Sequence, residues 1–198
     1  MTRFRLHFLI LALIFITVSS LAQDPIDATE LVERDGFTYR KGEEKPFTGT
    51  AVRWFGKGQK QIESNYLNGK LHGIETTWYS NGKPFMEISF QNGEFNGPYR
   101  QWYPDGQLEL EKEYGKGMMN GPSIHWYENG VKENEGSFFD CRETGKWTFW
   151  YSNGTKMKEG EFLEGFEEGR WIYWNEDGTH SREVMYKNGE ILSEKALE

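Results

Sequence analysis

Six glutamates recur at intervals of 24 residues, and regularly spaced carboxylates could carry out acid–base chemistry. They are Glu63, Glu87, Glu111, Glu135, Glu159 and Glu183. If neighbouring members lie two strands apart in a sheet, their backbones are ~9.5 Å apart, near the upper end of the ~6.5–9.5 Å separation in inverting glycosidases. Acid–base catalysis, however, needs two carboxylates in different environments, whereas a repeated position gives each one the same surroundings. We therefore expect each glutamate to bind a neighbouring backbone N–H or lysine, and we predict no enzymatic activity.

Six tryptophans recur at the same interval of 24 residues. They are Trp54, Trp78, Trp102, Trp126, Trp150 and Trp174. Rings ~9.5 Å apart could stack on alternate sugars of a polysaccharide or hold apolar side chains of an extended peptide. The candidate binding residues are Trp78, Trp102, Trp126 and Trp150. The alternative is that each tryptophan packs between turns and holds the array together.

The residues that could bind a metal or act as a nucleophile lack the necessary spacing. Beyond the N-terminal leader the histidines are His72, His125 and His180, at three different positions within the 24-residue interval. No Cys or His pair has zinc-ligand spacing, and there is no EF-hand loop, P-loop or G-x-S-x-G elbow. The single cysteine, Cys141, lies at a turn position, and we expect it to be inert. The sequence therefore predicts no metal and no cofactor.

These columns belong to six repeats of 24 residues without insertion or deletion: 49–72, 73–96, 97–120, 121–144, 145–168 and 169–192. A glycine opens each repeat, as at Gly73, and a second aromatic column includes Phe90. The structural repeat positions comprise the first-turn glycines and four of the glutamates: Gly82, Gly106, Gly130, Gly154, Glu87, Glu111, Glu135 and Glu159. Such a period is typical of a repeat array.

Turn dipeptides convert this period into structure. Asn81-Gly82 and its equivalents tolerate φ > 0 twice, as a type I′ hairpin turn requires, and a second turn such as Asn92-Gly93 follows 11 residues later. Two strands of ~6 residues fit into each repeat and leave no room for helices. We predict an all-β fold, an elongated, twisted, single antiparallel sheet of tandem hairpins.

The strand pleat assigns side chains to the two faces of this sheet. Gly73 and Phe90 are expected opposite each other on one face together with Tyr79, and Trp78 and Glu87 on the other. We expect one aromatic set to fill the concave face, and the tryptophan column to cover the convex face or the turns.

The ends of the array differ from its repeats. Residues 23–30 are expected to be a flexible lead-in, and residues 31–48, around Asp35-Gly36, an atypical capping hairpin. Residues 193–198 are a tail, and we expect the segment after Gly189 to be a final edge strand or a short helix. Residues 1–22 have the features of a signal peptide: Arg3 and Arg5, an apolar stretch over 8–18, and small residues before a cut after Ala22. The alternative is an uncleaved N-terminal anchor.

Charge limits the partners. Removing the leader with its two arginines changes the net charge from −8 to −10. An acidic chain repels nucleic-acid phosphates and anionic membrane surfaces, so we expect neither as a partner. After the leader, no segment is apolar enough to cross a bilayer.

The unit G-x4-W-[YF]-x-[ND]-G-x4-E-x2-[YF]-x-[NDKE]-G over residues 49–192, with `KPFTG` at 45–49, resembles the variant MORN repeat of bacterial exported proteins. This resemblance implies a twisted sheet of hairpins that serves as an interaction or membrane-association platform. Relatives are often labelled automatically as antitoxins of toxin–antitoxin systems, which fits poorly with export. The departures from the unit are Gly56-Lys57, Asn175 and Cys141.

We therefore expect an exported, non-catalytic, monomeric scaffold that binds a protein partner in the periplasm, at the cell surface or outside the cell. A glycan- or cell-wall-binding module that uses the tryptophan column is the first alternative. An antitoxin-like partner of a toxin is the second.

Overall fold

A computed structural model describes residues 24–56 and 58–197 of the chain; the expected signal peptide lies outside these residues. The elements are β1 (Ile26–Asp27), a 3-10 turn η1 (Ala28–Glu30), β2 (Leu31–Arg34), β3 (Phe37–Arg40), β4 (Gly49–Trp54), β5 (Lys60–Leu67), β6 (Lys70–Leu71), β7 (Gly73–Trp78), β8 (Pro84–Gln91), β9 (Glu94–Trp102), β10 (Leu108–Gly115), β11 (Met118–Trp126), β12 (Lys132–Phe139), β13 (Arg142–Trp150), β14 (Lys156–Leu163), β15 (Phe166–Trp174), β16 (His180–Lys187) and β17 (Glu190–Ala196). The described residues contain no α-helix.

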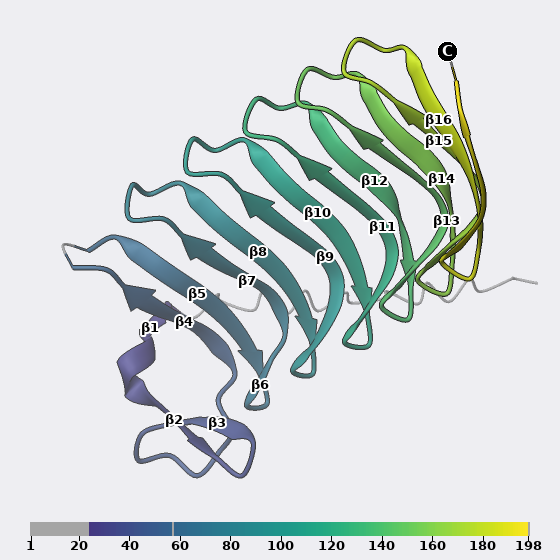
Figure 1. Cartoon of the computed structure of the whole chain (residues 1–198). Helices are drawn as coiled ribbons and strands as arrows, with labels where there is room; N and C mark the ends of the chain where they lie inside the picture. Colours follow the sequence, from purple (N-terminus) through teal and green to yellow (C-terminus); the bar gives the residue numbers. More distant parts are fainter. Residues whose placement is uncertain (1–23, 57, 198) are drawn as a thin grey trace, which may run out of the picture.

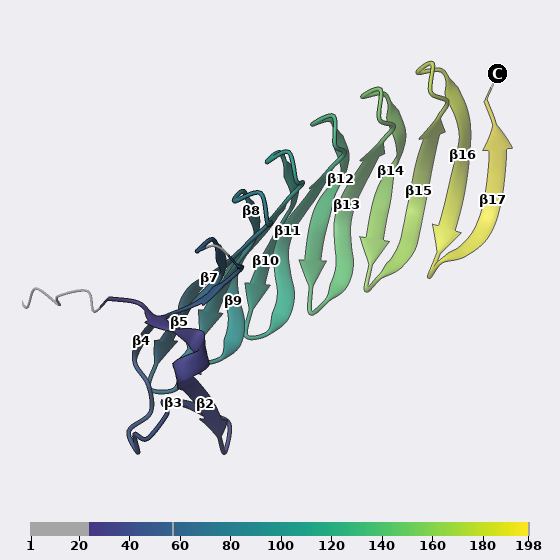
Figure 2. The same ribbon diagram turned by 90° about the vertical axis from the view of Figure 1, so that its left-hand side faces the viewer.

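Consecutive hairpins form one large sheet, which confirms the predicted fold class. The sheet has 15 strands, and from β4 to β17 consecutive strands are antiparallel neighbours, except that short β6 pairs only with β5 and β5 pairs also with β7 (Figure 1). Strand direction rotates steadily along the array, as the right-handed twist of β-strands requires (Figure 2). Because each strand pairs only with the strands before and after it, every 24-residue unit contacts its immediate neighbours.

The second turn of each repeat has the backbone of a type I′ hairpin. Asn92 and Gly93 have φ of 54° and 87°, and Lys116-Gly117 and Glu164-Gly165 show the same pair of positive values. The turn amide also reaches the preceding hairpin, as in Gly93 N to Leu71 O at 2.8 Å. The tight turn therefore closes its own hairpin and joins it to the previous one.

The type I′ prediction is wrong for the first turn. Of Asn81 and Gly82, only Gly82 has a positive φ, and its N–H donates to Tyr79 O at 2.9 Å. The Asn81 side chain instead accepts from Lys83 N at 3.0 Å and donates to Pro104 O of the next repeat at 3.0 Å. The asparagine thus stabilises a wider loop through its side chain, which removes the need for a positive φ of its own.

Strand register places Gly73 opposite Phe90, Thr76 opposite Glu87, and Trp78 opposite Pro84. Between Thr77 and Trp78 the register shifts at a β-bulge, which leaves Phe85 as the extra residue. We call the side of the sheet that carries the column of Phe90 the aromatic face, and the side that carries Trp78 and Glu87 the Trp–Glu face. The two residue sets lie on opposite faces, as the pleat predicted.

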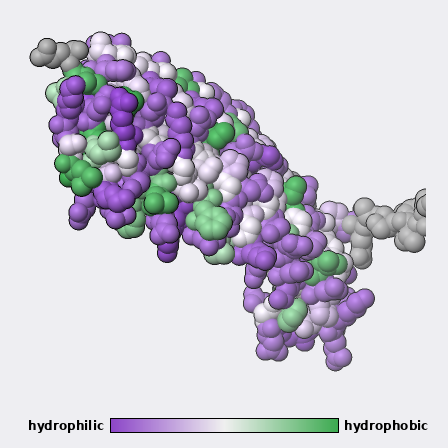
Figure 3. Space-filling model, turned by 90° about the vertical axis from the view of Figure 1, so that its right-hand side faces the viewer, coloured by the Kyte–Doolittle hydropathy of each residue, from purple (hydrophilic) through white to green (hydrophobic). Residues whose placement is uncertain are grey.

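Most of the buried hydrophobic side chains belong to the aromatic face. They include Trp171 at 0% exposure, Val184 at 2%, Ile88 at 4% and Trp147 at 5%. Viewed from the right-hand side of Figure 1, the surface is mainly hydrophilic and its hydrophobic side chains form separate small groups (Figure 3). A single-layer sheet therefore acquires a core by crowding large rings on one face.

At the two ends, only the lead-in differs from what was expected. The lead-in expected to be flexible contains β1, which pairs in parallel with β4 through Ile26 opposite Ala51, followed by η1. Backbone hydrogen bonds to an otherwise open sheet edge explain this order. Strands β2 and β3 form a separate two-stranded sheet around Asp35-Gly36. At the other end, most of the tail belongs to β17, an exposed edge strand, and not to a helix.

Candidate functional site

The tryptophan column lies at the ends of the first strands of the repeats. Trp78, Trp102, Trp126 and Trp150 are the last residues of β7, β9, β11 and β13, and all four are half-buried. From Trp102 onward, the hydroxyl of the preceding repeat's tyrosine holds the strand end: Tyr79 donates to Trp102 O at 2.8 Å, and the same bond recurs at 2.7–3.0 Å to Trp126, Trp150 and Trp174. Burial raises the pKa of Tyr79, Tyr103 and Tyr127, so these phenols remain donors at neutral pH. In these four repeats the tyrosine after each tryptophan thus positions the next tryptophan.

One side chain separates each pair of neighbouring tryptophans, because the second strand of the hairpin runs between them. Along the row these side chains are Lys60, Pro84, Leu108, Lys132 and Lys156. Lys60 Nζ lies 5.6 Å from the ring centroid of Trp78, within cation–π range. The tryptophans therefore do not form a row of free rings.

Three lysines of this row also pair with a glutamate. We call the sets Lys60–Glu63–Trp78, Lys132–Glu135–Trp150 and Lys156–Glu159–Trp174 the Lys–Glu–Trp triads. In the third, Lys156 Nζ lies 2.8 Å from Glu159 Oε2 and 5.3 Å from the Trp174 centroid. Each ammonium thus lies between a carboxylate of its own strand and the tryptophan of the next repeat.

The glutamate column contains two further ion pairs, Arg100 with Glu111 and Arg170 with Glu183. Glu159 has two cationic partners, since Lys146 Nζ also lies 3.2 Å from its carboxylate. The hydrogen bond from Lys156 is the main cause that lowers the pKa of Glu159, with Lys146 adding to it. The pKa of Glu183 is lowered as well, mainly by its hydrogen bond from Arg170, so Glu159 and Glu183 are charged at neutral pH.

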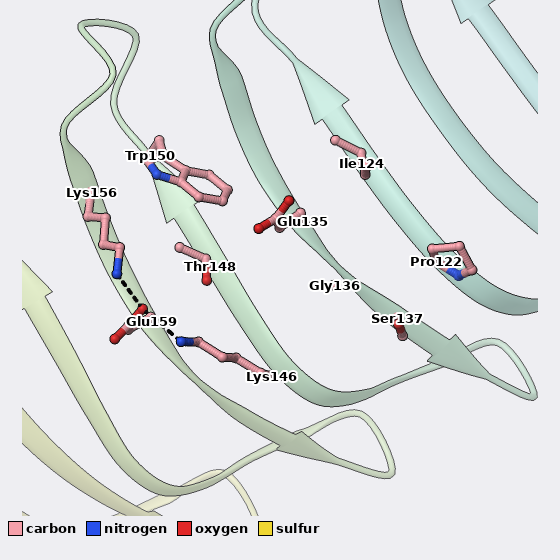
Figure 4. Close-up of a pocket in the computed structure, with 10 residues that line it drawn as sticks. All are labelled: Pro122, Ile124, Glu135, Gly136, Ser137, Lys146, Thr148, Trp150, Lys156 and Glu159. Atoms are coloured by element: carbon pink, nitrogen blue, oxygen red, sulfur yellow. Dashed lines mark hydrogen bonds and ion pairs between the residues drawn. The ribbon is translucent and has the colours of Figure 1, made fainter.

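A groove of about 480 Å³ opens on the Trp–Glu face between β11 and β14 (Figure 4). Across the strands its lining runs from Ile124 of β11 through Glu135 of β12 to Thr148 and Trp150 of β13, and ends at Glu159 of β14 with its two lysines. Lys146 is 64% exposed at its rim. Aromatic, apolar and charged groups are thus available together on one open surface, without the enclosure of a catalytic cleft.

Two buried tryptophans outside the column, Trp147 and Trp171, were not predicted from the sequence. They lie on the aromatic face, where Phe162 packs edge-on against both, with its ring centroid 5.9 Å from that of Trp147 and 5.0 Å from that of Trp171. Each ring occupies the space over a strand glycine, Gly136 or Gly160, where a Cβ would collide with the indole. These two glycines lie outside the repeat columns, and that irregularity was the sequence signal for the buried rings.

The histidines and the cysteine do not converge. His125 Nδ1 lies 2.6 Å from Glu133 Oε2, whereas His72 belongs to the short connection before β7 and His180 begins β16. Within residues 24–56 and 58–197, no three or more His, Cys, Asp or Glu side chains are grouped as a metal site would require. Cys141 is exposed, and its φ is 63° at the turn between β12 and β13.

No helix in the described part of the chain is both long and apolar enough to span a membrane.

Several solved structures match part of the chain. Three of them are a TarM mutant from S. aureus in complex with fondaparinux, alpha-GlcNAc-glycerol and UDP (10% identity, 59% of this chain and 21% of that one, TM-score 0.31), TarM (11%, 58% and 21%, TM-score 0.31), and a GtfA/B complex bound to UDP and GlcNAc (12%, 55% and 21%, TM-score 0.24). This chain spans about a fifth of the length of those chains. TM-scores this low carry no argument about the fold or the function. No curated protein matches the sequence.

The family comparison agrees with the repeat. The model of the MORN repeat variant matches residues 71–92, 95–115, 143–164 and 167–188. Each matched segment begins at or next to a type I′ turn and includes the following hairpin, so its boundaries coincide with the structural unit. The chain therefore contains MORN repeats of the variant type, and such repeats suggest a repeat scaffold.

Proposed function

We propose that this protein is an exported, non-catalytic scaffold that binds a protein partner on its Trp–Glu face. The observation that carries the proposal is the groove between β11 and β14, where half-buried Trp150 lies between the charged groups of Glu135 and of Glu159 with its lysines. Aromatic residues at the centre with charged groups at the rim are typical of protein interfaces. The repetition of this arrangement along the sheet favours an extended partner that contacts several repeats.

The carboxylates support binding over catalysis. Glu135 and Glu159 both accept a hydrogen bond from the lysine three residues before them, so their surroundings are similar. Two carboxylates in similar surroundings lack the separate acid and base roles that hydrolysis requires. Interfaces use the same groups to fix the register of a partner.

The export part of the proposal rests on the sequence of residues 1–22. N-terminal sequencing of the protein recovered from the periplasmic or culture fraction should start at Gln23. A full-length chain that stays in the cytoplasm would contradict export and would leave the binding proposal to be tested by itself.

Site-specific photo-crosslinking tests the binding surface. A benzoylphenylalanine introduced at Lys146, on the groove rim, should give a discrete crosslinked protein with a cell-envelope extract. The same probe at Ile191, which is exposed on β17, is the matched control and should not. Excess unlabelled wild-type protein should compete, whereas excess Trp150→Ala protein should not. Equal crosslinking from both positions, or equal competition by both proteins, would remove the groove from the proposal.

A glycan ligand is the second candidate, because half-buried rings recur two strands apart along one face. The side chains that lie between the rings oppose stacking on consecutive sugars. Co-sedimentation with purified cell-wall polysaccharide distinguishes the candidates: binding that is lost in Trp150→Ala, with no protein crosslink, would replace the protein partner by a glycan.

A further inference from the structure

Of the five side chains that separate the tryptophans, Pro84 and Leu108 cannot supply the cation of a triad. In the repeat of Leu108 the glutamate pairs with Arg100 instead, which leaves the repeat of Pro84 to be explained. At the position equivalent to Lys60, Lys132 and Lys156, the second full repeat has Pro84. The glutamate and the tryptophan of the set are nevertheless present, as Glu87 and Trp102. Pro84 is exposed and the other two are half-buried, so the position is open to solvent on the Trp–Glu face.

The structure supplies no substitute for this lysine. Arg100 lies directly across from Glu87 in the register of β8 and β9, but its guanidinium binds the other neighbouring glutamate, with Nε 2.8 Å from Glu111 Oε1. Within residues 24–56 and 58–197, the Glu87 carboxylate forms no ion pair or hydrogen bond. Over the same residues, no cation lies above the Trp102 ring. Glu87 is thus the single glutamate of its column whose charge has no partner in the described chain.

The three triads show which chemical group a glutamate and a tryptophan in these positions bind. In each of them a primary ammonium lies within 6 Å of the indole centroid, at 5.6, 5.9 and 5.3 Å, and pairs with the glutamate. A charge-assisted hydrogen bond and a cation–π contact act on the same group, and the two reinforce each other. The strand register that places these groups in the triads also places Glu87 and Trp102.

We propose that Glu87 and Trp102 bind a lysine side chain of the protein partner, which completes at this repeat the triad that the chain completes by itself elsewhere. The inference rests on the proposed function and adds a specific site and the chemistry of the group it recognises. It also gives the array a unique position, because the repeats would otherwise offer a partner several equivalent registers. The acidic balance of the chain, with a net charge of −8, favours the approach of a basic segment.

The test uses Nα-acetyl-lysine-N-methylamide as the probe, and its Nε-acetylated form as the neutral control. The readout is the indole N–H signal of Trp102 in ¹⁵N-labelled full-length protein, assigned with Trp102→Phe. The charged probe should shift this signal saturably, and the neutral probe should bind about tenfold more weakly or not at all.

Three variants separate the site from its surroundings. Glu87→Gln keeps the shape of the side chain and should weaken binding about tenfold. Pro84→Lys should place the chain's own ammonium in the site and abolish probe binding. Glu63→Gln changes the same kind of carboxylate within a complete triad and should leave the Trp102 response unchanged.

Unchanged binding by Glu87→Gln, or equal responses to the charged and neutral probes, would overturn the inference. Glu87→Gln is nearly isosteric, so the test stands even if Pro84→Lys fails to fold, which the amide spectrum would show. If a partner crosslinks at the groove but Glu87→Gln binds it and the probe like wild type, the lysine site fails while the proposed function stands. If the probe test succeeds and no protein crosslinks, the proposed partner fails instead.

Discussion

The indole of Trp147 lies over Gly136 so closely that a Cβ on that glycine would come within 2.1 Å of the ring. The absence of a side chain at Gly136 therefore leaves the space in which the Trp147 ring is buried. The indole N–H completes the contact by donating to Ser137 O at 3.2 Å. The next repeat contains the same contact between Gly160 and Trp171, so the strand glycine and the buried tryptophan occur together in both repeats.

This contact predicts that Gly136→Ala destabilises the protein by about 2 kcal/mol or more, because a buried ring must move to admit the methyl group. Gly115→Ala is the control, since its new Cβ would meet only Asn120 Cβ at 3.7 Å, an ordinary contact. Urea unfolding followed by tryptophan fluorescence measures both. Equal effects of the two substitutions would mean that the ring is free to leave Gly136.

The tyrosine that follows each tryptophan should contribute through its hydroxyl group. Tyr103→Phe removes the donor to Trp126 O and should cost about 1 kcal/mol, the net value of one hydrogen bond. Phe55 occupies the equivalent position in the first repeat, so Phe55→Tyr should be neutral or stabilising. Thermal unfolding of the two variants checks the pair. No loss in Tyr103→Phe would show that ring packing alone fixes the strand end.

Cys141 should be a local defect. Its φ of 63° is one that glycine adopts without strain, and the equivalent positions in the other repeats hold glycine. Cys141→Gly should therefore stabilise by about 1 kcal/mol and remove any oxidation-dependent dimer. Cys141→Ala removes the thiol but keeps the Cβ, so it should abolish the dimer without the gain in stability. If both variants melt alike, the turn is not strained.

Deleting one whole repeat should be tolerated. Without residues 121–144 the remaining hairpins keep their register, because each contacts only its neighbours. Deleting residues 121–132 instead removes most of β11 and reverses the direction of every strand that follows. Circular dichroism and melting should show a folded, shorter protein in the first case and a disrupted one in the second. Similar melting of both proteins is the result that the repeat assignment does not allow.

Glu159 should make the free energy of unfolding depend on pH in the acidic range. Lys156 and Lys146 hold its folded-state pKa below the ordinary value, so its contribution is present above the unfolded pKa of about 4.3 and is lost as the pH falls through the folded pKa. Glu159→Gln should therefore be less stable than wild type at pH 7, and the difference should vanish at low pH. Denaturant unfolding at both pH values measures this. A difference that persists in acid would indicate a contribution from shape and not from charge.

Much of the fold could be read from the chain. The 24-residue period and the turn dipeptides predicted the hairpins, their order and the two faces, because the pairing of consecutive strands depends on local turn geometry. The turn types were less accessible. Lys116 and Glu164 adopt positive φ because the tight hairpin imposes it, whereas Asn81 avoids it by bonding the next repeat.

The sequence by itself determined the repeat, the strand order and the columns of tryptophan and glutamate, since these follow from residue spacing and from steric limits on the backbone. Only the tertiary structure decided which member of a column has a partner. Glu87 and Glu135 occupy the same position in their repeats, yet Lys132 pairs with Glu135 while Arg100 turns from Glu87 towards Glu111. Ion pairs and ring burial depend on side chains that the sheet brings together from separate strands, and those distances are set by packing, not by spacing along the chain.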